Sequence, residues 1–548
     1  MKKIWQIIIL IVVAVVCFFI GKSVGDGCCA PEYTLDSSTE TSTVTTTSGQ
    51  ICGYIENGIY TYKGVPYAEA ERFGLPHAPE AWEGVRSSRY YGPTCPQAFR
   101  SMWLMDRVAF SSQWDDGYAG ENCLRVNIWT PGINDGKKRP VMFWIHGGGF
   151  STGSGQEQPG YDGHNIASKG DVVFVSVNHR LNVLGHLDLS SFGEEYAQTG
   201  NLGMLDLVAA LEWVRDNIEA FGGDPDNVTI MGQSGGGGKV SALYCMDNAK
   251  GLFHRAVVQS GSMTTCMQQK HAQAVGERTA KLLGLSTNNI ADIKTVPYDK
   301  LLEAGTKALE EVKNELIASG DLVLTSPWQF NWKPVIDGTI LKADPFTEGT
   351  ELLNNDVPLM VGSTLNEMAG FAGLPDVATW EEATEAAAKQ YGDNAATVIA
   401  EYRNAYPKAE PKDFFRLDTG TRITVIEQAD IKAKDGGAPV YVYMFNYAAQ
   451  VFDNDFYAPH CAEIAYAFNN VMTSSFCTGG TKEAQKVGEE TSDAWLSFAR
   501  TGNPNAKSLP QWDAYTIEDG ATMVFDAPEC YVNHGNFDRK LMEAVQGK

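Results

Sequence analysis

A serine flanked by glycines is the first feature of the sequence that could do chemistry. Ser234 lies in the segment GQSGG, residues 232–236, directly after the predicted strand 227–231. This G-x-S-x-G pattern is typical of a tight strand-to-helix turn that exposes the serine, and the glycines are needed where neighbouring backbone passes too close for a Cβ atom. The residues that follow, 239–243, can begin a helix. We therefore predict that Ser234 is a nucleophile for acyl transfer.

A serine hydroxyl becomes a good nucleophile only when a nearby base takes its proton. Where the serine sits on such a turn, the acid and then the histidine follow it in the chain. Four histidines follow Ser234, namely His254, His271, His460 and His534. The first two come too soon for an acid-bearing strand to intervene, and the last lies in a polar tail. His460 follows an aromatic strand and precedes an apolar helix, so we predict that it is the base.

Two carboxylates that precede His460 could orient its imidazole and stabilise the imidazolium. Glu367 follows residues 357–362 (VPLMVG), which predict a buried strand. Asp337 follows the shorter apolar segment 334–336, but Asp337 and Gly338 together are also an ordinary turn signal. The spacing favours Glu367 and leaves Asp337 as the alternative.

Three consecutive glycines, residues 147–149, follow His146 at the end of the apolar segment 140–145. A tetrahedral intermediate carries an oxyanion, and backbone N–H groups reach it most easily where side chains are absent. We expect this loop, together with the N–H of Gly235, to form an oxyanion hole, with His146 bracing the loop. No set of His, Cys and carboxylate residues has the spacing of a metal site, and we expect no metal and no cofactor.

The elements that must position these residues alternate between strands and helices. Short apolar segments at 140–145, 171–178 and 227–231 are typical of strands, and residues 202–218 have helical spacing of their apolar side chains. Strands that are apolar without alternation, and that are joined by helices, indicate a parallel sheet covered on both faces. The predicted fold class is α/β.

The net charge excludes one class of partner, and the N-terminal residues indicate where the protein is located. The chain has 548 residues and a net charge of −24, so its acidic surface would repel the phosphates of a nucleic acid, and we expect no such partner. Within residues 1–25, Lys2 and Lys3 precede an apolar run over residues 7–20, a pattern typical of a signal peptide or, if uncleaved, an N-terminal membrane anchor. We expect an extracytoplasmic protein, secreted or anchored, that meets the membrane only through this segment.

The next segment has a different composition. Residues 34–48 are rich in Ser and Thr and have almost no large apolar side chains, so they bury too little surface to offset the entropy of ordering. We therefore predict a tether over residues 26–48. The remaining chain, residues 49–548, has a globular pattern to its end and is expected to be one catalytic unit.

Several motifs occur in the order found in type-B carboxylesterases, the family that includes the cholinesterases. The sequence resembles this family from about residue 49 to residue 529. The matching segments are YKGVPYA (62–68), ENCLRVNIW (121–129), WIHGGGF (144–150), NHRL (178–181), the stretch 200–234, VGS (361–363) with Glu367, PH (459–460) with Glu463, and FARTGNPN (498–505).

The resemblance implies the α/β-hydrolase fold, in which a mostly parallel central sheet has helices on both faces. It implies three catalytic roles, with Ser234 as nucleophile, Glu367 as orienting acid and His460 as general base. Asp337 then falls in a turn of the family that is not catalytic. The oxyanion donors that it implies are Gly148, Gly149 and Gly235.

Two further expectations come from the resemblance. Cys95 and Cys123 resemble the first conserved loop disulfide of the family, which agrees with export. Cholinesterases have a Glu before the nucleophile, near the cationic choline group, whereas this chain has the neutral Gln233. The difference argues against a preference for choline esters.

The resulting hypothesis is a serine carboxylic-ester hydrolase that forms an acyl-enzyme and acts on small to medium uncharged esters. The expected partner is a small-molecule ester substrate. Alternatives with the same triad are a lipase, a thioesterase or an amidase. A non-catalytic adhesion or binding protein of the cholinesterase-like kind is the alternative from another class.

Overall fold

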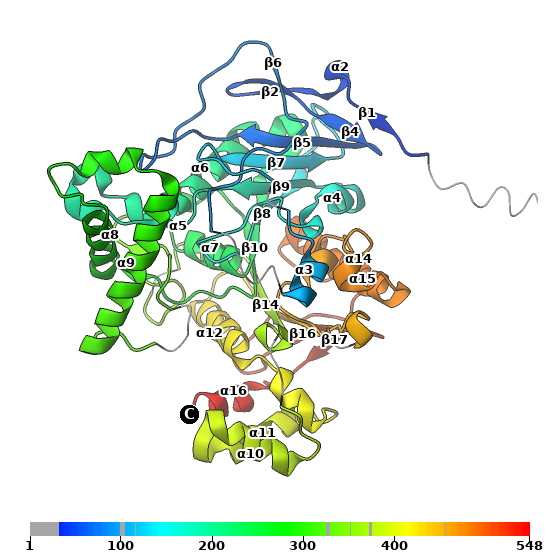
Figure 1. Ribbon diagram of the computed structural model, residues 1–548. Coiled ribbons are helices and arrows are strands. Elements are labelled where there is room, and N and C mark those ends of the chain that lie inside the picture. The colour runs from blue at the N-terminus through cyan, green and yellow to red at the C-terminus, as the bar shows by residue number, and fades with distance from the viewer. Residues whose placement is uncertain are drawn as a thin grey trace, which may run out of the picture.

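The computed structural model describes residues 32–98, 105–115, 117–324, 329–350, 352–371, 375–454 and 456–547, and Figure 1 shows how its elements are arranged. The strands are β1 (Leu35–Asp36), β2 (Thr43–Thr46), β3 (Gly49–Cys52), β4 (Tyr54–Glu56), β5 (Ile59–Pro66), β6 (Val85–Ser87), β7 (Arg125–Thr130), β8 (Arg139–Ile145), β9 (Val173–Asn178), β10 (Gly223–Gln233), β11 (Arg255–Gln259), β12 (Met267–Gln268), β13 (Val335–Ile336), β14 (Leu359–Thr364), β15 (Val440–Phe445), β16 (Thr522–Phe525) and β17 (Tyr531–Asn533).

The α-helices lie between and after these strands. They are α2 (Thr39–Ser42), α3 (Asp106–Ser112), α4 (His164–Gly170), α5 (Asn182–His186), α6 (Leu202–Asn217), α7 (Gly235–Tyr244), α8 (Gln269–Leu282), α9 (Tyr298–Ser319), α10 (Trp380–Tyr391), α11 (Ala395–Ala405), α12 (Thr419–Asp435), α13 (Ile464–Ala467), α14 (Ser475–Thr478), α15 (Lys482–Thr501) and α16 (Arg539–Val545).

A 12-stranded sheet forms the centre of the structure, in the order β1-β4-β5-β7-β9-β8-β10-β11-β14-β15-β16-β17. Every pair from β9 to β16 is parallel, and the pairs outside this block are antiparallel. Parallel neighbours need crossover connections, which the helices supply. The carboxyl ends of the parallel strands therefore meet at one edge, where ligands bind in open α/β sheets.

The two faces of the sheet pack against different helices. In β8, Val141, Phe143 and Ile145 join a core with residues of α6, α7 and α12, whereas Met142 and Trp144 join a second core with residues of α4, α13 and α15. In Figure 1, α6, α7 and α12 lie on the left of the sheet and α4 and α15 on the right. Both faces are buried, which explains why the strands are apolar without alternation.

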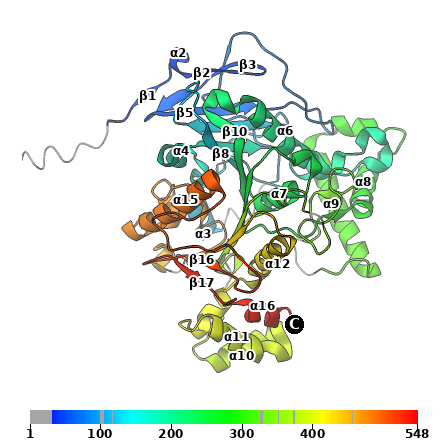
Figure 2. The ribbon, with the colours of Figure 1, turned by 180° about the vertical axis from the view of Figure 1, so that it is seen from behind.

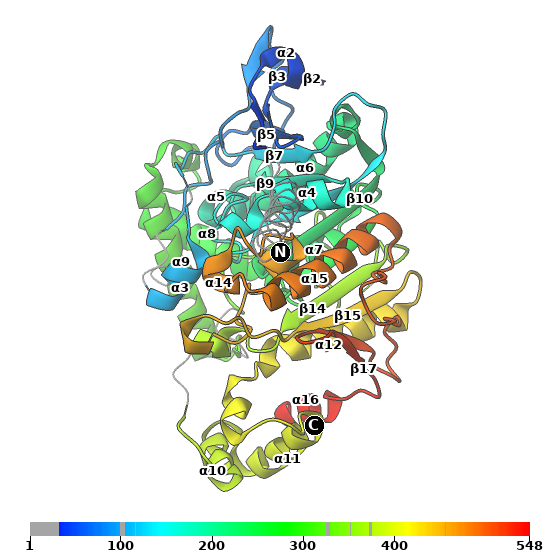
Figure 3. The same ribbon diagram turned by 90° about the vertical axis from the view of Figure 1, so that its right-hand side faces the viewer.

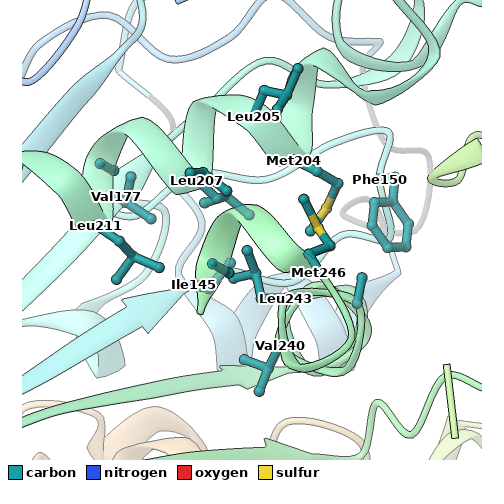
Figure 4. Close-up of a cluster of buried hydrophobic side chains, with 14 of the residues drawn as sticks. Ile145, Phe150, Val177, Met204, Leu205, Leu207, Leu211, Val240, Leu243 and Met246 are labelled. Carbon is teal, nitrogen blue, oxygen red and sulfur yellow. The ribbon is translucent and has the colours of Figure 1, made fainter. Parts of the chain in front are cut away.

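The first core lies directly beneath the candidate site. Figure 4 shows side chains of α6 and α7 interleaved with those of the strand ends, among them Leu207, Leu211, Val240, Leu243 and Ile145. These labelled side chains are all fully buried. Close packing of this kind fixes α7, and with it the residue at its N-terminus, relative to the sheet.

The predicted α/β class and its mostly parallel sheet are confirmed. The segments predicted at 140–145, 171–178 and 227–231 are β8, β9 and β10, and the predicted helix 202–218 is α6. The sequence also predicts the strands before Glu367 and His460, which are β14 and β15. The predicted start of β10 is wrong, because this strand begins at Gly223 instead of residue 227.

Residues 32–48 differ from the tether that their composition predicts. β2 pairs antiparallel with β3, and Ser42 and Val44 are buried. Threonine and valine are β-branched, so a Ser/Thr-rich segment can add a strand where a partner edge is available. The remaining residues of the predicted tether, 26–31, and the predicted signal or anchor, residues 1–25, lie outside the described residues.

A third, smaller core lies away from the sheet. It joins α10, α11 and α16 through side chains such as Val398, Tyr402 and Leu541, and Figure 2 shows this group at the bottom of the view with the C-terminus. On another side of the sheet, α3 packs on α14, with the rings of Phe110 and Phe476 5.5 Å apart (Figure 3). Within the described part of the chain, no helix is both long and apolar enough to cross a membrane.

Candidate active site

A tight turn forms where β10 meets α7. Ser234 sits at this turn with φ 57° and ψ −126°, and a positive φ is strained for a residue with a side chain. Its N–H donates to the carbonyl of Gln259, 2.8 Å away at the end of the neighbouring β11. A Cβ on Gly236 would lie 2.1 Å from the carbonyl oxygen of Ile145, so the close approach of α7 to β8 requires glycine there.

Glu367 and His460 lie on the loops that follow β14 and β15. The Glu367 Oε2 atom contacts Nδ1 of His460, and the backbone N–H of His460 donates to the Glu367 carbonyl at 3.1 Å. The other carboxylate oxygen accepts the N–H of Thr364 at 2.8 Å. The Glu367 side chain is fully buried, whereas that of His460 is 20% exposed. The carboxylate is thus fixed beneath an imidazole that stays accessible.

Gln233 brings the histidine to the turn that carries the serine. Its side-chain nitrogen lies 3.3 Å from each ring nitrogen of His460, and its oxygen accepts a hydrogen bond from the thiol of Cys461 at 3.2 Å. Gln233 directly precedes Ser234 in the chain. The imidazole therefore lies beside the end of β10, and side chains from three separate strand ends meet at one edge of the sheet.

Asp337, the alternative acid, lies in a different environment. It follows β13, and its carboxylate accepts the N–H groups of Thr339 and Ile340 at 2.8 and 2.7 Å. The side-chain nitrogen of Asn201 donates to its other oxygen at 3.0 Å. These are the bonds of a turn, and it is Glu367 that contacts His460.

The glycine loop lies against the serine. A Cβ on Gly147 would be 3.4 Å from the Cβ of Ser234, and a Cβ on Gly235 would be 2.3 Å from the Cα of Gly149. Gly148 and Gly149 both have a positive φ, at 82° and 62°. Gly147 and Gly149 therefore lie close to the serine turn and the first residue of α7.

The carbonyl groups of this loop are anchored. The Nδ1–H of His146 donates to the Gly147 carbonyl at 3.0 Å, and the N–H of Thr152 donates to the Gly148 carbonyl at 3.1 Å. In a trans peptide the N–H points opposite to the carbonyl, so these bonds fix the directions of the next two N–H groups. Among the described residues, none accepts a hydrogen bond from the N–H of Gly148, Gly149 or Gly235. Unpaired backbone donors are rare, and backbone N–H groups of this kind can bind a negatively charged oxygen.

Carboxylates set the electrostatics around the imidazole. Burial lowers the pKa of His460, but the charge and hydrogen bond of Glu367 outweigh it, and the pKa is raised. Glu463 is fully buried, and its Oε1 accepts the side-chain N–H of Gln259 at 3.3 Å. Burial, followed by repulsion from Glu367, raises the pKa of Glu463 to about 7. Glu463 therefore changes its charge near neutral pH, beside the Glu367–His460 pair.

The cysteines of the predicted disulfide are neighbours. Cys95 and Cys123 are both buried and both free thiols in this structure. Burial, and then a hydrogen bond with Cys123, raises the pKa of the Cys95 thiol, and the N–H of Leu181 donates to its sulfur at 3.3 Å. A bond between them stays a prediction.

Three buried polar residues of this region were not predicted. Gln259 supports Ser234 and Glu463, Glu463 lies beside the Glu367–His460 pair, and the Lys239 ammonium donates to the His146 carbonyl at 3.0 Å. A lysine within an otherwise apolar helix was the one available signal in the sequence. The described residues contain no group of three or more His, Cys, Asp or Glu side chains that could hold a metal ion.

Comparisons with known proteins show the family of this chain. A model of the carboxylesterase family matches residues 40–543. The para-nitrobenzyl esterase of Bacillus subtilis (strain 168) is 34% identical over 494 residues, which cover 88% of this chain and 94% of that protein. Carboxylesterase 3 of Homo sapiens is 31% identical over 490 residues, covering 83% of this chain and 81% of that protein.

Solved structures give the same result. A structure described as an esterase from anaerobic Clostridium hathewayi that can hydrolyze aliphatic aromatic polyesters has a TM-score of 0.82 and 36% identity, covering 94% of this chain and 100% of that one. A PNB esterase has a TM-score of 0.71 and 31% identity, covering 92% and 100%. The match along nearly the whole sequence and the shared α/β-hydrolase fold lead to one conclusion: this chain belongs to the carboxylesterase family and is a carboxylic-ester hydrolase.

Proposed function

We propose that the hydrolysis proceeds through an acyl-enzyme formed on Ser234, with His460 as general base and Glu367 as the acid that orients it. The observation that carries this proposal is the contact between Glu367 and Nδ1 of His460, made where Gln233 joins the imidazole to the serine turn. A carboxylate on Nδ1 holds the proton there and leaves Nε2 to accept the proton of the serine.

The chemical steps follow from these positions. The Ser234 oxygen attacks the ester carbonyl while its proton passes to Nε2 of His460, and the carbonyl oxygen becomes an oxyanion. The N–H groups of Gly148, Gly149 and Gly235 stabilise that charge. The imidazolium then protonates the leaving alcohol, and a water molecule, deprotonated by His460, attacks the acyl-enzyme and releases the acid.

The proposed substrates are small to medium uncharged esters. Gln233 supports this choice, because a neutral amide beside the imidazole gives no charge to attract a cationic alcohol. Hydrolysis of thioesters, amides or lipids by the same residues is the alternative. A substrate panel separates these classes, and it includes an aliphatic–aromatic polyester because the Clostridium hathewayi relative is described as hydrolysing such polymers.

The test uses purified residues 26–548 with p-nitrophenyl esters of increasing acyl length. Turnover should be lost in Ser234→Ala, and brief exposure of the unmodified enzyme to substrate at low pH should add one acyl mass to the peptide that contains Ser234. Ser241→Ala is the matched control, since that serine lies in α7 with its hydroxyl on the Gly237 carbonyl at 3.0 Å. Normal activity in Ser234→Ala, or an acyl group on another residue, would overturn the assignment.

We propose further that the enzyme acts outside the cytoplasm as one catalytic unit, in which β1 and β2 join the predicted range 49–548, with residues 1–25 as a signal peptide or an uncleaved anchor. The apolar run at 7–20 and the proximity of the Cys95 and Cys123 thiols support export. Fractionation, N-terminal sequencing and non-reducing peptide mapping of the exported protein test these points. Full-length protein confined to the cytosol, or Cys95 free in exported protein, would contradict them.

A further inference from the structure

A lysine is buried one turn after the proposed nucleophile. Lys239 lies in α7, and its exposed fraction is 0%. Lysine is almost never fully buried unless its charge is matched by nearby polar groups, because removing an ammonium from water is costly. A residue of this kind next to a catalytic turn calls for a reason beyond packing.

The contacts of Lys239 lie at both ends of the glycine loop. Its ammonium donates to the carbonyl of His146, 3.0 Å away, and lies 5.4 Å from the centre of the Phe150 ring. His146 directly precedes residues 147–149, and Phe150 directly follows them. One cation therefore holds the residue that enters the loop, through a charge-assisted hydrogen bond, and the residue that leaves it, through a cation–π contact.

The positive charge of Lys239 also lies close to the N-terminus of α7. Lys239 is four residues after Gly235, which puts both on the same side of the helix, and helical side chains lean towards the N-terminus. A Cβ on Gly236 would come within 2.9 Å of the His146 carbonyl oxygen, so the partner of Lys239 faces the first turn of α7. The first turn already carries a partial positive charge, and the ammonium adds to it.

The charge of Lys239 acts on two imidazoles close to the loop. Burial, reinforced by the charge of Lys239, lowers the pKa of His179 well below its usual range, and burial together with the same charge lowers that of His186 to about 3. The ring of His146 is stacked on His179 at 5.0 Å, and its Nδ1–H is used on the Gly147 carbonyl. The Lys239 ammonium acts on both imidazoles, whereas the other cation near His186, Arg180, forms an ion pair with Asp206.

We propose that Lys239 is a positioning residue for the oxyanion hole, whose ammonium fixes both ends of the glycine loop and adds positive potential where the oxyanion forms. This inference rests on the proposed roles of Ser234 and the loop. A group that acts on the oxyanion stabilises the transition state more than the bound ester. Loss of Lys239 should therefore lower kcat and leave KM nearly unchanged.

The main experiment compares Lys239→Met, which keeps the length of the side chain and removes the charge, with the unmodified enzyme. We expect kcat to fall on the order of 10- to 100-fold, less than for loss of a direct oxyanion donor, with KM within about twofold. A trifluoromethyl ketone, which forms a tetrahedral oxyanion adduct with the serine, should lose affinity by the same factor. The corresponding secondary alcohol, which forms no oxyanion, should bind equally well to both proteins.

Lys432→Met is the matched control. Lys432 is also fully buried, but its ammonium donates to the carbonyls of Asn355, Gly436 and Ala438, before β14 and β15 begin and thus at the opposite edge of the sheet. This variant should lose stability and keep both kcat and the affinity for the ketone. If Lys239 only stabilised the fold, Lys239→Met would likewise lose stability and keep kcat and the affinity for the ketone.

The outcomes separate the two proposals. If Lys239→Met is folded and keeps kcat and ketone affinity, the inference about Lys239 is wrong while the role of Ser234 stands. If Ser234→Ala is active, the proposed role of Ser234 is wrong, and the inference about Lys239 is wrong with it. If Lys239→Met does not fold, Lys239→Gln, which keeps a donor for the His146 carbonyl without the charge, replaces it with the same expectations. Failure of both variants to fold would assign Lys239 to folding and reject the catalytic role.

Discussion

The two ends of the parallel strands are built in opposite ways. At the carboxyl end, the buried carboxylates of Glu367 and Glu463 repel each other. At the amino end, charges are matched: Arg139, at the start of β8, donates to Asp135 at 2.6 Å and to Asp171 at 2.7 Å.

The difference shows where strain is tolerated in this protein. Buried groups that repel each other cost free energy and persist only where the surrounding packing imposes them. Matched charges at the amino end stabilise the strand entries instead. Substitutions at the carboxyl end should therefore change activity with little loss of stability, and those at the amino end should do the reverse.

The largest fall in kcat is expected when the proposed base is removed. His460→Ala should lower kcat by about 10⁴-fold or more, because the serine then keeps its proton. The double variant Ser234→Ala/His460→Ala should be no worse than either single variant, since residues that act as a unit do not contribute additively. Single-turnover kinetics measure both. A double variant much slower than each single one would show that the two residues act independently.

Substitution of Glu367 should change both kcat and the pH dependence of activity. Glu367→Gln should lower kcat by about 10²- to 10⁴-fold, because the imidazole loses its orientation and its partner charge. Glu367 raises the pKa of His460, and only the neutral imidazole is a base, so activity rises with pH as His460 loses its proton. In the variant this rise should move to lower pH. A rise of kcat/KM at unchanged pH would contradict the role of Glu367.

At the amino end the expected effect is on stability. Arg139→Met should lower the free energy of unfolding by about 1–3 kcal/mol, less than for a fully buried ion pair because Asp135 and Asp171 are 30% and 57% exposed. Denaturant unfolding measures the loss, and kcat and KM should stay within about twofold. A large fall in kcat in the folded variant would break the contrast between the two ends.

The smallest effect concerns Glu463. Its pKa of about 7 means that it is ionised above neutral pH, where its charge raises the pKa of His460. Glu463→Gln should therefore move the rise of kcat/KM to lower pH by about 0.3–1 unit, with little change in the plateau. Gln259→Leu, which removes the hydrogen bond that lowers the pKa of Glu463, should move the profile in the same direction by a smaller amount. A Glu463→Gln profile that coincides with that of the unmodified enzyme would show that the two groups are not coupled.

Local patterns were enough for the parts of the site that depend on near neighbours in the chain. The strand before Ser234, the glycines around it and the glycine loop after β8 are all encoded in short segments, because each conformation depends on residues a few positions apart. The tether prediction failed for the opposite reason. Residues 43–46 have few apolar side chains, and they form a strand because β3 offers an edge.

The sequence by itself determined the α/β class, the serine turn and the choice of His460 among the four histidines that follow it. Its spacing favoured Glu367 over Asp337, and the tertiary structure added the contact itself, since only Glu367 reaches the imidazole. The tertiary structure also decided what the sequence by itself did not predict. It alone revealed Lys239 and Glu463, whose partners lie far away in the sequence or on other strands. The physical reason is that a buried charge is defined by what surrounds it, and those surroundings exist only once the strand ends are brought together.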